Sequence, residues 1–229
     1  MNMATTTESA ALAISDGGTI AAASKLEILD VKGNKVAFGS IFESQKTIVV
    51  FIRHFFCGSC QAYVERLASV PQQALEKADA KIVIVGCGEW NPIQSYAGKS
   101  ALLLPVLSPG YSDVLHPETT QFHGPIYADP SRALYHALGM NIEKLEGTPA
   151  GQERRGYLTK GAFVNAMQSI WKGPLKHPSL IGKQGNISQL GGDFVLGPGP
   201  QCTFASRMQH TEDHIEVRDL MKKAGVDAG

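Results

Sequence analysis

Two cysteines separated by two residues, Cys57 and Cys60, are the part of the sequence best suited to chemistry. A cysteine reacts as its thiolate, and an ordinary thiol with a pKa of about 8.5 is mostly protonated at neutral pH. At the start of a helix, free backbone N–H groups and the positive end of the helix dipole stabilise such an anion. We therefore interpret the CxxC as a redox-active dithiol at a helix start.

The two cysteines are predicted to have different roles. The side chain of Cys57 is expected to project beyond the helix end, so Cys57 is the nucleophile that attacks a peroxide or a disulfide. Cys60 follows about one helical turn later. It is then close enough to resolve a mixed disulfide or a sulfenic acid formed on Cys57.

Basic side chains near the pair are candidates for supporting this chemistry. Arg53 and His54 precede the CxxC, and because side chains alternate along a strand we expect at most one of them to point at the thiol. We favour Arg53, whose guanidinium keeps its charge and could hold a peroxide or a thiolate. His54 is a secondary candidate that is otherwise a packed core histidine. Arg207 follows the last predicted strand and could reach the same site, or form an ordinary surface ion pair.

A metal site is an alternative use of the same cysteines. The CxxC could be half of a zinc site, with Cys87 as a third ligand and His54 as a fourth. No second CxxC or HxxxH pair accompanies it. His210 and His214 are four residues apart, but His210 is expected to precede a helix cap, which weakens a metal role for this pair.

Two further alternatives involve no reaction at the CxxC. The cysteines could be small buried hydrophobic residues, as we expect for Cys87 and Cys202, although Cys87 is also a candidate secondary redox partner. The chain could instead be a non-catalytic binding module that uses residues 141–190 as a recognition surface.

Two apolar runs predict the strands that position the pair. Residues 47–52 (TIVVFI) have the β-branched and aromatic composition typical of a strand covered on both faces, and residues 81–85 (KIVIV) repeat it. Between these runs, apolar residues recur at helical spacing: Tyr63, Val64, Leu67 and Val70. The sequence therefore predicts a right-handed β-α-β unit with the CxxC where the first strand meets the helix.

Local signals predict the remaining elements. These are a hairpin over 25–31 and 35–38, a strand at 125–128, a helix at 131–138 between Asp129 and Gly139, a helical face within 157–171, strands at 194–196 and 202–205, and a last helix from Thr211 to Gly225. We expect a flexible extension over 1–22 and one domain over 23–229. The fold class is α/β, a thioredoxin-like mixed sheet flanked by helices, with an insertion at 141–190 before the C-terminal β-hairpin and helix.

Composition narrows the possible partners and locations. The 21 basic residues balance 21 acidic ones and form no basic run, which argues against nucleic-acid binding. The N-terminal residues carry neither a basic leader nor a sustained apolar stretch, so we expect no secretory signal and no membrane span. These features predict a cytoplasmic protein, and a homodimer is compatible with them.

Three segments of the chain, taken in order, resemble the AhpC/TSA-type peroxiredoxin-like 2 family of thioredoxin-fold proteins. They are FIRHFFCGSCQAYVERL, IYADPSRALYHALGM and GGDFVLGPGPQCTFASRM. The resemblance spans roughly residues 25 to 225. It implies redox-active cysteines at 57 and 60 and reduction of a peroxide, endoperoxide or disulfide substrate. It also implies no tightly bound cofactor, with an external reductant such as thioredoxin, glutathione or an NADPH-linked system.

The sequence departs from better-known relatives of this fold at three places. Val50 and His54 stand where typical peroxiredoxins have the Pro and Thr of a PxxxTxxC motif, which predicts less efficient peroxidase activity. The site is FCGSC where thioredoxins have WCGPC, and Gly191-Gly192 replaces their cis-proline. Protein disulfides are therefore expected to be handled differently from the way thioredoxin handles them.

Overall fold

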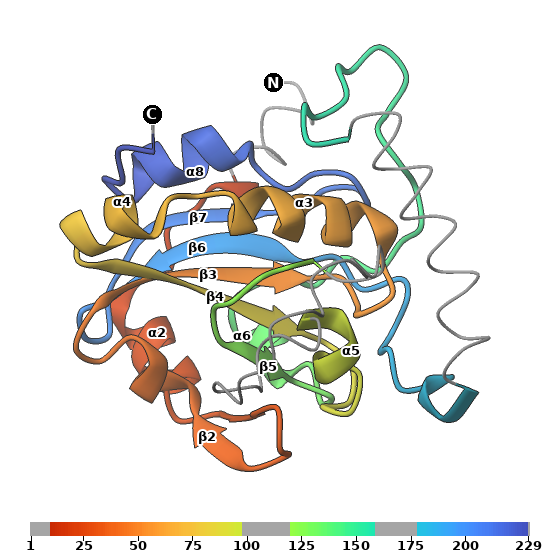
Figure 1. Cartoon of the computed structure of the whole chain (residues 1–229), viewed down its shortest axis with the longest axis horizontal. Helices are drawn as coiled ribbons and strands as arrows, with labels where there is room; N and C mark the ends of the chain where they lie inside the picture. Colours follow the sequence, from red (N-terminus) through yellow and green to blue (C-terminus); the bar gives the residue numbers. More distant parts are fainter. Residues whose placement is uncertain (1–9, 98–119, 159–177, 229) are drawn as a thin grey trace, which may run out of the picture.

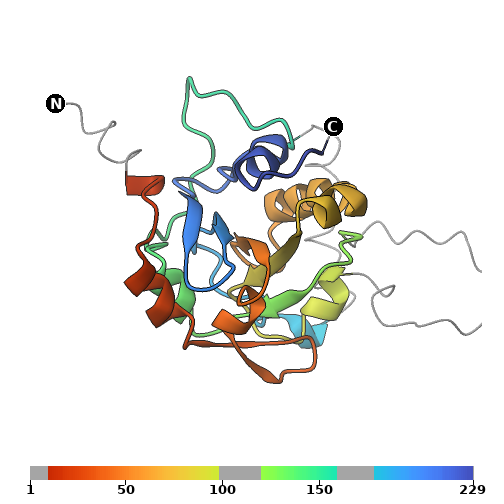
Figure 2. The same cartoon turned by 90° about the vertical axis from the view of Figure 1, so that its left-hand side faces the viewer.

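Seven strands form one mixed sheet at the centre of the protein, with helices on both faces (Figures 1 and 2). This computed structural model describes residues 10–97, 120–158 and 178–228. The strand order is β2-β1-β5-β4-β3-β6-β7. The strands are β1 (Glu27–Leu29), β2 (Lys35–Ala37), β3 (Lys46–Ile52), β4 (Ala80–Gly86), β5 (Ile126–Ala128), β6 (Gly192–Leu196) and β7 (Cys202–Arg207).

Short helices, none longer than about three turns, lie between these strands and at both ends of their series. They are α2 (Gly17–Ala23), α3 (Gly58–Ala68), α4 (Gln72–Lys77), α5 (Ile93–Ala97), α6 (Ala133–Ala137) and α8 (Val217–Lys223), with 3-10 turns η1 (Phe38–Ile41) and η3 (Pro178–Leu180). No helix was predicted from the sequence at α5.

Strand β3 lies at the middle of the sheet and leads directly to the cysteines. It pairs in parallel with β4 and antiparallel with β6, and its residues from Thr47 to Ile52 are buried. The β-branched composition that predicted a strand covered on both faces is explained by this position. The predicted β-α-β unit of β3, α3 and β4 is confirmed.

The two faces of the sheet carry separate apolar cores. Alternate residues of β3, Ile48, Val50 and Ile52, pack with α3 and α8 on one face. The intervening Val49 and Phe51 pack with α2, η1 and α6 on the other face. The period-two alternation of the strand thus divides its side chains between the two cores.

The outer strands also match their predictions. The hairpin is formed by β1 and β2 at one edge of the sheet, and the pair before the C-terminus is formed by β6 and β7 at the other. Strand β5 pairs in parallel with β4. Most of the helical face predicted within 157–171 lies outside the described residues.

The expectation of a flexible extension over residues 1–22 is wrong for residues 17–22. Residues 17–23 form α2, whose N-cap Asp16 accepts a hydrogen bond from the backbone N–H of Thr19 at 2.9 Å. Ile20 and Ala23 are fully buried in the core beside α6. Two apolar residues at this spacing are enough to anchor one short helix, although the segment shows no longer period.

Two predicted helices begin later than expected. The helix predicted at 131–138 starts at Ala133, because Arg132 takes a left-handed conformation with φ of 60°. The N-cap residue is therefore Arg132 rather than Asp129, although Oδ2 of Asp129 still accepts from the backbone N–H of Leu134 in the first turn at 2.9 Å. Gly139, at φ of 82°, ends the helix as predicted.

The last helix starts at Val217, so Thr211 does not cap it. The backbone N–H of Thr211 donates to Glu146 O at 2.9 Å, and that of Ile215 donates to Asp193 Oδ2 at 3.1 Å. These tertiary contacts use the groups that an earlier helical turn would need. Gly225, at φ of 70°, ends the helix as predicted.

Gly191 lies against the central strand, and its substitution by alanine is expected to destabilise the protein strongly. A Cβ at this position would lie 1.8 Å from the backbone oxygen of Phe51, which the sheet holds in place. We expect Gly191→Ala to lower the free energy of unfolding by about 3 kcal/mol, the upper part of the range for overpacking. Gly17→Ala in α2 is the control, because its Cβ would lie at an ordinary contact distance, 3.6 Å, from the backbone oxygen of Pro200. Urea denaturation that finds the two variants equally stable would contradict this account.

Candidate active site

Cys57 lies at the N-cap of α3, as predicted. Its φ of −79° and ψ of 113° are extended, and its carbonyl accepts the first helical hydrogen bond from the N–H of Gln61 at 2.9 Å. The side chain therefore stands where the first N–H groups of the helix are free, which favours an anion. Cys57 is only 3% exposed.

Two polar side chains contact the sulfur of Cys57. The guanidinium Nη1 of Arg53 donates to Sγ at 3.3 Å, and the hydroxyl of Ser59 lies 3.1 Å from it. The same hydroxyl donates to Thr211 O at 3.0 Å, which joins the start of α3 to the loop before α8. Cys57 is thus buried without being sealed in purely apolar packing.

Arg53 contacts all three buried cysteines through three different groups. Its backbone N–H donates to Cys60 Sγ at 3.4 Å, its guanidinium donates to Cys57, and its carbonyl accepts from Cys87 Sγ at 2.8 Å. A second guanidinium nitrogen donates to Ile187 O at 2.6 Å. Within the described part of the chain no carboxylate pairs with this 7% exposed arginine, so a Cys57 thiolate would be its nearest anion.

The surroundings lower the pKa of Cys57 well below the ordinary value. The largest cause is a hydrogen bond from Cys60, followed by the positive charges of His54 and Arg53 and a hydrogen bond from Ser59, all against the opposing effect of burial. Burial lowers the pKa of His54 itself, so its ring is largely neutral at pH 7. Arg53 is the cation that remains.

Cys60 has the opposite electrostatic character. It is fully buried in the first turn of α3, and burial, together with its hydrogen bond to Cys57 and the charge of that neighbour, raises the pKa of its thiol well above the ordinary value. One thiol of the pair is thus prepared as an anion while the other holds its proton, which is the asymmetry that a nucleophile and a resolving thiol require.

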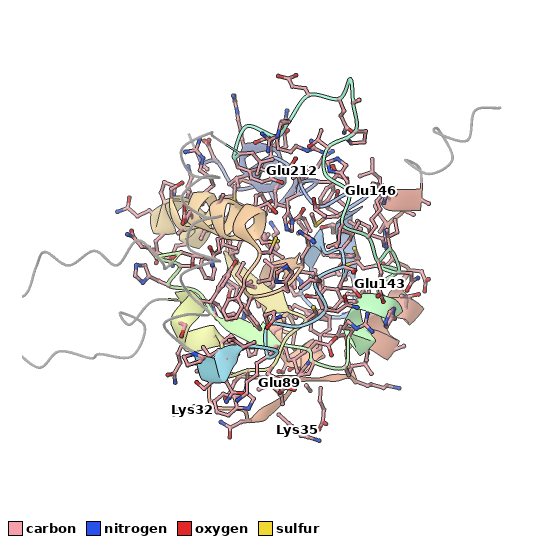
Figure 3. The ribbon with its side chains drawn as sticks, turned by 90° about the vertical axis from the view of Figure 1, so that its right-hand side faces the viewer. Lys32, Lys35, Glu89, Glu143, Glu146 and Glu212 are labelled. Atoms are coloured by element: carbon pink, nitrogen blue, oxygen red, sulfur yellow. The ribbon has the colours of Figure 1, made fainter. Side chains whose placement is uncertain are left out.

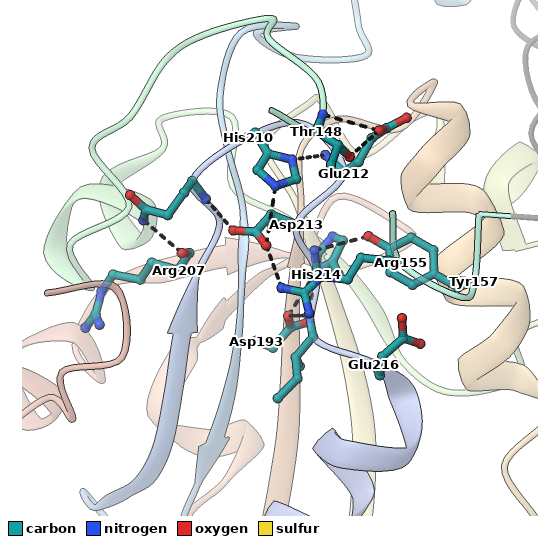
Figure 4. Close-up of polar contacts among 12 residues, drawn as sticks. Thr148, Arg155, Tyr157, Asp193, Arg207, His210, Glu212, Asp213, His214 and Glu216 are labelled. Carbon is teal, nitrogen blue, oxygen red and sulfur yellow. Dashed lines mark hydrogen bonds and ion pairs between the residues drawn. The ribbon is translucent and has the colours of Figure 1, made fainter. Parts of the chain in front are cut away.

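A histidine and an aspartate that were not predicted as redox-site residues lie close to Cys60, and Figure 4 shows the two side chains beside each other. His214 Nε2 is 3.8 Å from Cys60 Sγ, and Nδ1 of the same ring is 3.0 Å from Asp193 Oδ1. Both side chains are buried. Asp193 could have been noticed in the sequence, because it interrupts the otherwise apolar run that became β6.

The other candidate residues have different positions. His54 is buried, burial lowers its pKa, and no side-chain hydrogen bond joins it to Cys57 in the described residues, so it supports Cys57 less than Arg53 does. Cys87 is buried, and its pKa is raised to about 12, mainly by burial, so it is a poor nucleophile. Cys202 is half-buried on β7 and donates to Phe204 O at 3.1 Å.

Arg207 does not reach the cysteines. Its guanidinium donates to the backbone oxygens of Leu138, Ala11 and Ala13 and to the hydroxyl of Ser15. Figure 4 shows its side chain directed away from His214 and Asp193. Arg207 leaves β7 on the face that packs against the N-terminal segment, so the prediction that it could join the site is wrong.

The described parts of the insertion pack against the loop that carries His214. Glu212 accepts from the hydroxyl of Thr148 at 2.7 Å, and Arg155 donates to Asp213 Oδ1 at 2.7 Å (Figure 4). Figure 3 shows Glu146 of the insertion and Glu212 of this loop on the same face of the molecule, both in the upper part of the view. The insertion therefore supports the loop between β7 and α8.

The described residues also bear on a metal site and on a membrane span. No group of three or more His, Cys, Asp or Glu side chains among them could hold a metal ion. None of the helices described is long and apolar enough to cross a membrane.

Comparisons with known proteins identify relatives along most of the chain. A family model described as Redoxin matches residues 14–155, and one described as AhpC/TSA antioxidant enzyme matches residues 111–210. The chain is 30% identical to peroxiredoxin-like 2C of Mus musculus over 209 residues, which cover 90% of this chain and 80% of the relative. It is 23% identical to a chloroplastic thioredoxin-like protein, AAED1, of Arabidopsis thaliana, covering 90% and 72%.

A solved structure supports the fold. The peroxidoxin BcpB of Mycobacterium tuberculosis superposes with a TM-score of 0.52 at 9% identity, covering 87% of this chain and 91% of that one. The predicted thioredoxin-like fold is confirmed by this likeness and by the mixed sheet with helices on both faces. The chain belongs to the AhpC/TSA redoxin family, among the peroxiredoxin-like proteins.

Proposed function

We propose that the protein is a thiol oxidoreductase that reduces a peroxide with Cys57 as nucleophile and Cys60 as resolving thiol. The observation that supports this most strongly is the contact between the buried guanidinium of Arg53 and the sulfur of Cys57 at a helix N-cap. A buried cation without a carboxylate partner favours the thiolate form of the cysteine beside it.

The reaction proceeds in three steps. The Cys57 thiolate attacks one peroxide oxygen, the O–O bond breaks, the sulfur becomes a sulfenic acid, and the other oxygen leaves as water or an alcohol after taking up a proton. Cys60 then attacks the sulfenic sulfur, a disulfide forms, and water leaves. An external dithiol or thiol reductant supplies two electrons and two protons to restore both cysteines.

The exposure of Cys57 favours a small substrate. At 3% exposed, its sulfur is accessible to a hydroperoxide more readily than to a disulfide on the surface of a folded protein. Because Val50 and His54 replace the Pro and Thr of typical peroxiredoxins, Arg53 is the side chain proposed to hold the peroxide. Endoperoxides and small disulfides are the alternative substrates to compare with it.

One equivalent of hydrogen peroxide added to the reduced protein should produce an intramolecular disulfide. The expected product joins Cys57 and Cys60, and peptide mapping by mass spectrometry after alkylation identifies it. Thioredoxin with its NADPH-dependent reductase, or glutathione, should then return both thiols.

A linkage of Cys57 to any other cysteine would exclude Cys60 as the resolving thiol. Full retention of both free thiols after exposure to peroxides, endoperoxides and disulfides would instead favour the non-catalytic binding module.

A further inference from the structure

Three buried side chains from three parts of the fold line up behind the CxxC. Cys60 of α3 is 3.8 Å from Nε2 of His214, which precedes α8, and Nδ1 of His214 is 3.0 and 3.2 Å from the two oxygens of Asp193 on β6. Their exposed fractions are 0%, 1% and 0%. Residues this polar are rarely buried together without a partner or a role.

Cys60 needs a proton acceptor to act as the resolving thiol. Only a thiolate attacks the sulfenic acid efficiently. Burial and the adjacent negative charge of Cys57 both raise the pKa of Cys60, so it retains its proton while Cys57 is reduced. Oxidation of Cys57 to a sulfenic acid removes that negative charge, but the burial of Cys60 persists and still disfavours its thiolate, so the second step needs a residue that takes the proton.

The contacts of His214 orient its ring for this task. A carboxylate can only accept hydrogen bonds, so Asp193 holds the proton on Nδ1 and leaves the lone pair of Nε2 facing Cys60. Tyr63 stacks on the ring, with centroids 4.3 Å apart and an interplanar angle of 4°. Asp193 is fixed in turn by the backbone N–H of Ile215, at 3.1 Å.

We propose that His214 is the general base for the resolving step and that Asp193 is the residue that positions it. Nε2 takes the proton from Cys60 Sγ as this sulfur forms its bond to Cys57 Sγ. The S–O bond of the sulfenic acid breaks, and hydroxide leaves and becomes water with the proton that His214 returns. This inference rests on the proposed function, because it assigns a role within that second step.

The titratable groups that face His214 come from each element packed around it. They are Asp193 of β6, Cys60 and Tyr63 of α3, and Tyr157, whose hydroxyl accepts from the backbone N–H of His214 at 3.1 Å. Burial raises the pKa of both tyrosines above their ordinary value, so neither changes charge between pH 6 and 9. A change in the pH profile of this step is therefore not assigned to either tyrosine.

The test separates the two steps of oxidation in His214→Gln. The protein is mixed with hydrogen peroxide and quenched at intervals, so that dimedone labels the sulfenic acid and mass spectrometry quantifies the disulfide. We expect sulfenic acid formation within twofold of the wild-type rate and disulfide closure slower by about 10²-fold, at the lower end of the usual effect of a general base. Closure in the variant should also rise steeply with pH, because hydroxide must replace the imidazole.

Two further variants control the experiment. His210→Gln removes a buried histidine of the same loop that has no contact with the described cysteines, and it should close at the wild-type rate. Asp193→Asn keeps the volume of its side chain but no longer fixes the proton of His214. It should slow closure alone, by less than His214→Gln does, and it carries the test if that variant does not fold.

Three results would overturn the inference or its premise, and they can be told apart. Disulfide closure at the wild-type rate in His214→Gln would show that His214 is not the general base. Equal slowing of both steps in His214→Gln and Asp193→Asn would assign the pair a purely structural role. Wild-type protein that forms sulfenic acid but never the disulfide would instead overturn the proposed function.

Discussion

Replacing Cys57 by serine should abolish oxidation of the protein by peroxide, whereas replacing Cys60 by serine should stop the reaction at the sulfenic acid. A serine hydroxyl stays protonated beside Arg53 and does not attack a peroxide, so we expect the rate to fall by at least about 10³-fold. In Cys60→Ser the sulfenic acid forms on Cys57 and persists, because no second thiol contacts it. Dimedone labelling and a peroxide-consumption assay distinguish the two outcomes.

The control for these variants is Cys202→Ser. Cys202 is half-buried on β7 and has no contact with the pair, so its loss should leave the rate unchanged. If Cys57→Ser still consumes peroxide with external thiols at the wild-type rate, another cysteine is the nucleophile. Disulfide formation in Cys60→Ser would identify a different resolving thiol, and Cys87 is the first candidate because it contacts Arg53, as Cys57 does.

Alkylation of Cys57 by iodoacetamide should depend only weakly on pH between pH 8 and 6. A free thiol with a pKa of about 8.5 loses roughly 10²-fold of its thiolate over this interval. The hydrogen bond from Cys60 and the charges beside Cys57 lower its pKa well below that value, so the thiolate persists as the pH falls. Cys202, whose pKa is raised by burial, should lose reactivity steeply and serves as an internal reference.

Variants of the groups that lower this pKa should shift the profile to higher pH. Cys60→Ala removes the largest cause and should raise the ratio of the rates at pH 8 and pH 6 the most. Arg53→Met removes the lasting cation and should raise the same ratio, while Arg53→Lys keeps the charge and restores part of the effect. A wild-type profile centred on the ordinary thiol pKa would remove the argument for activation and favour the binding module.

Local sequence signals were sufficient for the centre of the fold and for the position of the dithiol. The β-branched run of β3, the helical spacing after Cys60 and the Gly-ended helices each depend on neighbours in the sequence. For that reason Cys57 at a helix start could be predicted. The period of a strand predicted that at most one of Arg53 and His54 points at the thiol, and Arg53 was favoured for its permanent charge, which agrees with its contact with Cys57.

Features set by tertiary contacts could not be predicted in this way. Thr211 has the composition of an N-cap, but its backbone bonds to Glu146 in the insertion, and the helix starts six residues later. Arg207 is far from the CxxC in the sequence. Its side chain leaves β7 toward the N-terminal segment, so it does not reach the cysteines. His214 was considered only as a metal ligand, since its partner Asp193 is 21 residues away in the sequence.

Position 53 has one further consequence for how this site tolerates change. Two of its three contacts with sulfur are made by the main chain, so every substitution except proline preserves the links to Cys60 and Cys87 while only the link to Cys57 depends on the side chain. A substitution can thus remove the positive charge beside Cys57 while the main-chain contacts with Cys60 and Cys87 remain. A substitution at this one residue can therefore change the ionisation of the first cysteine while it leaves the placement of the second intact.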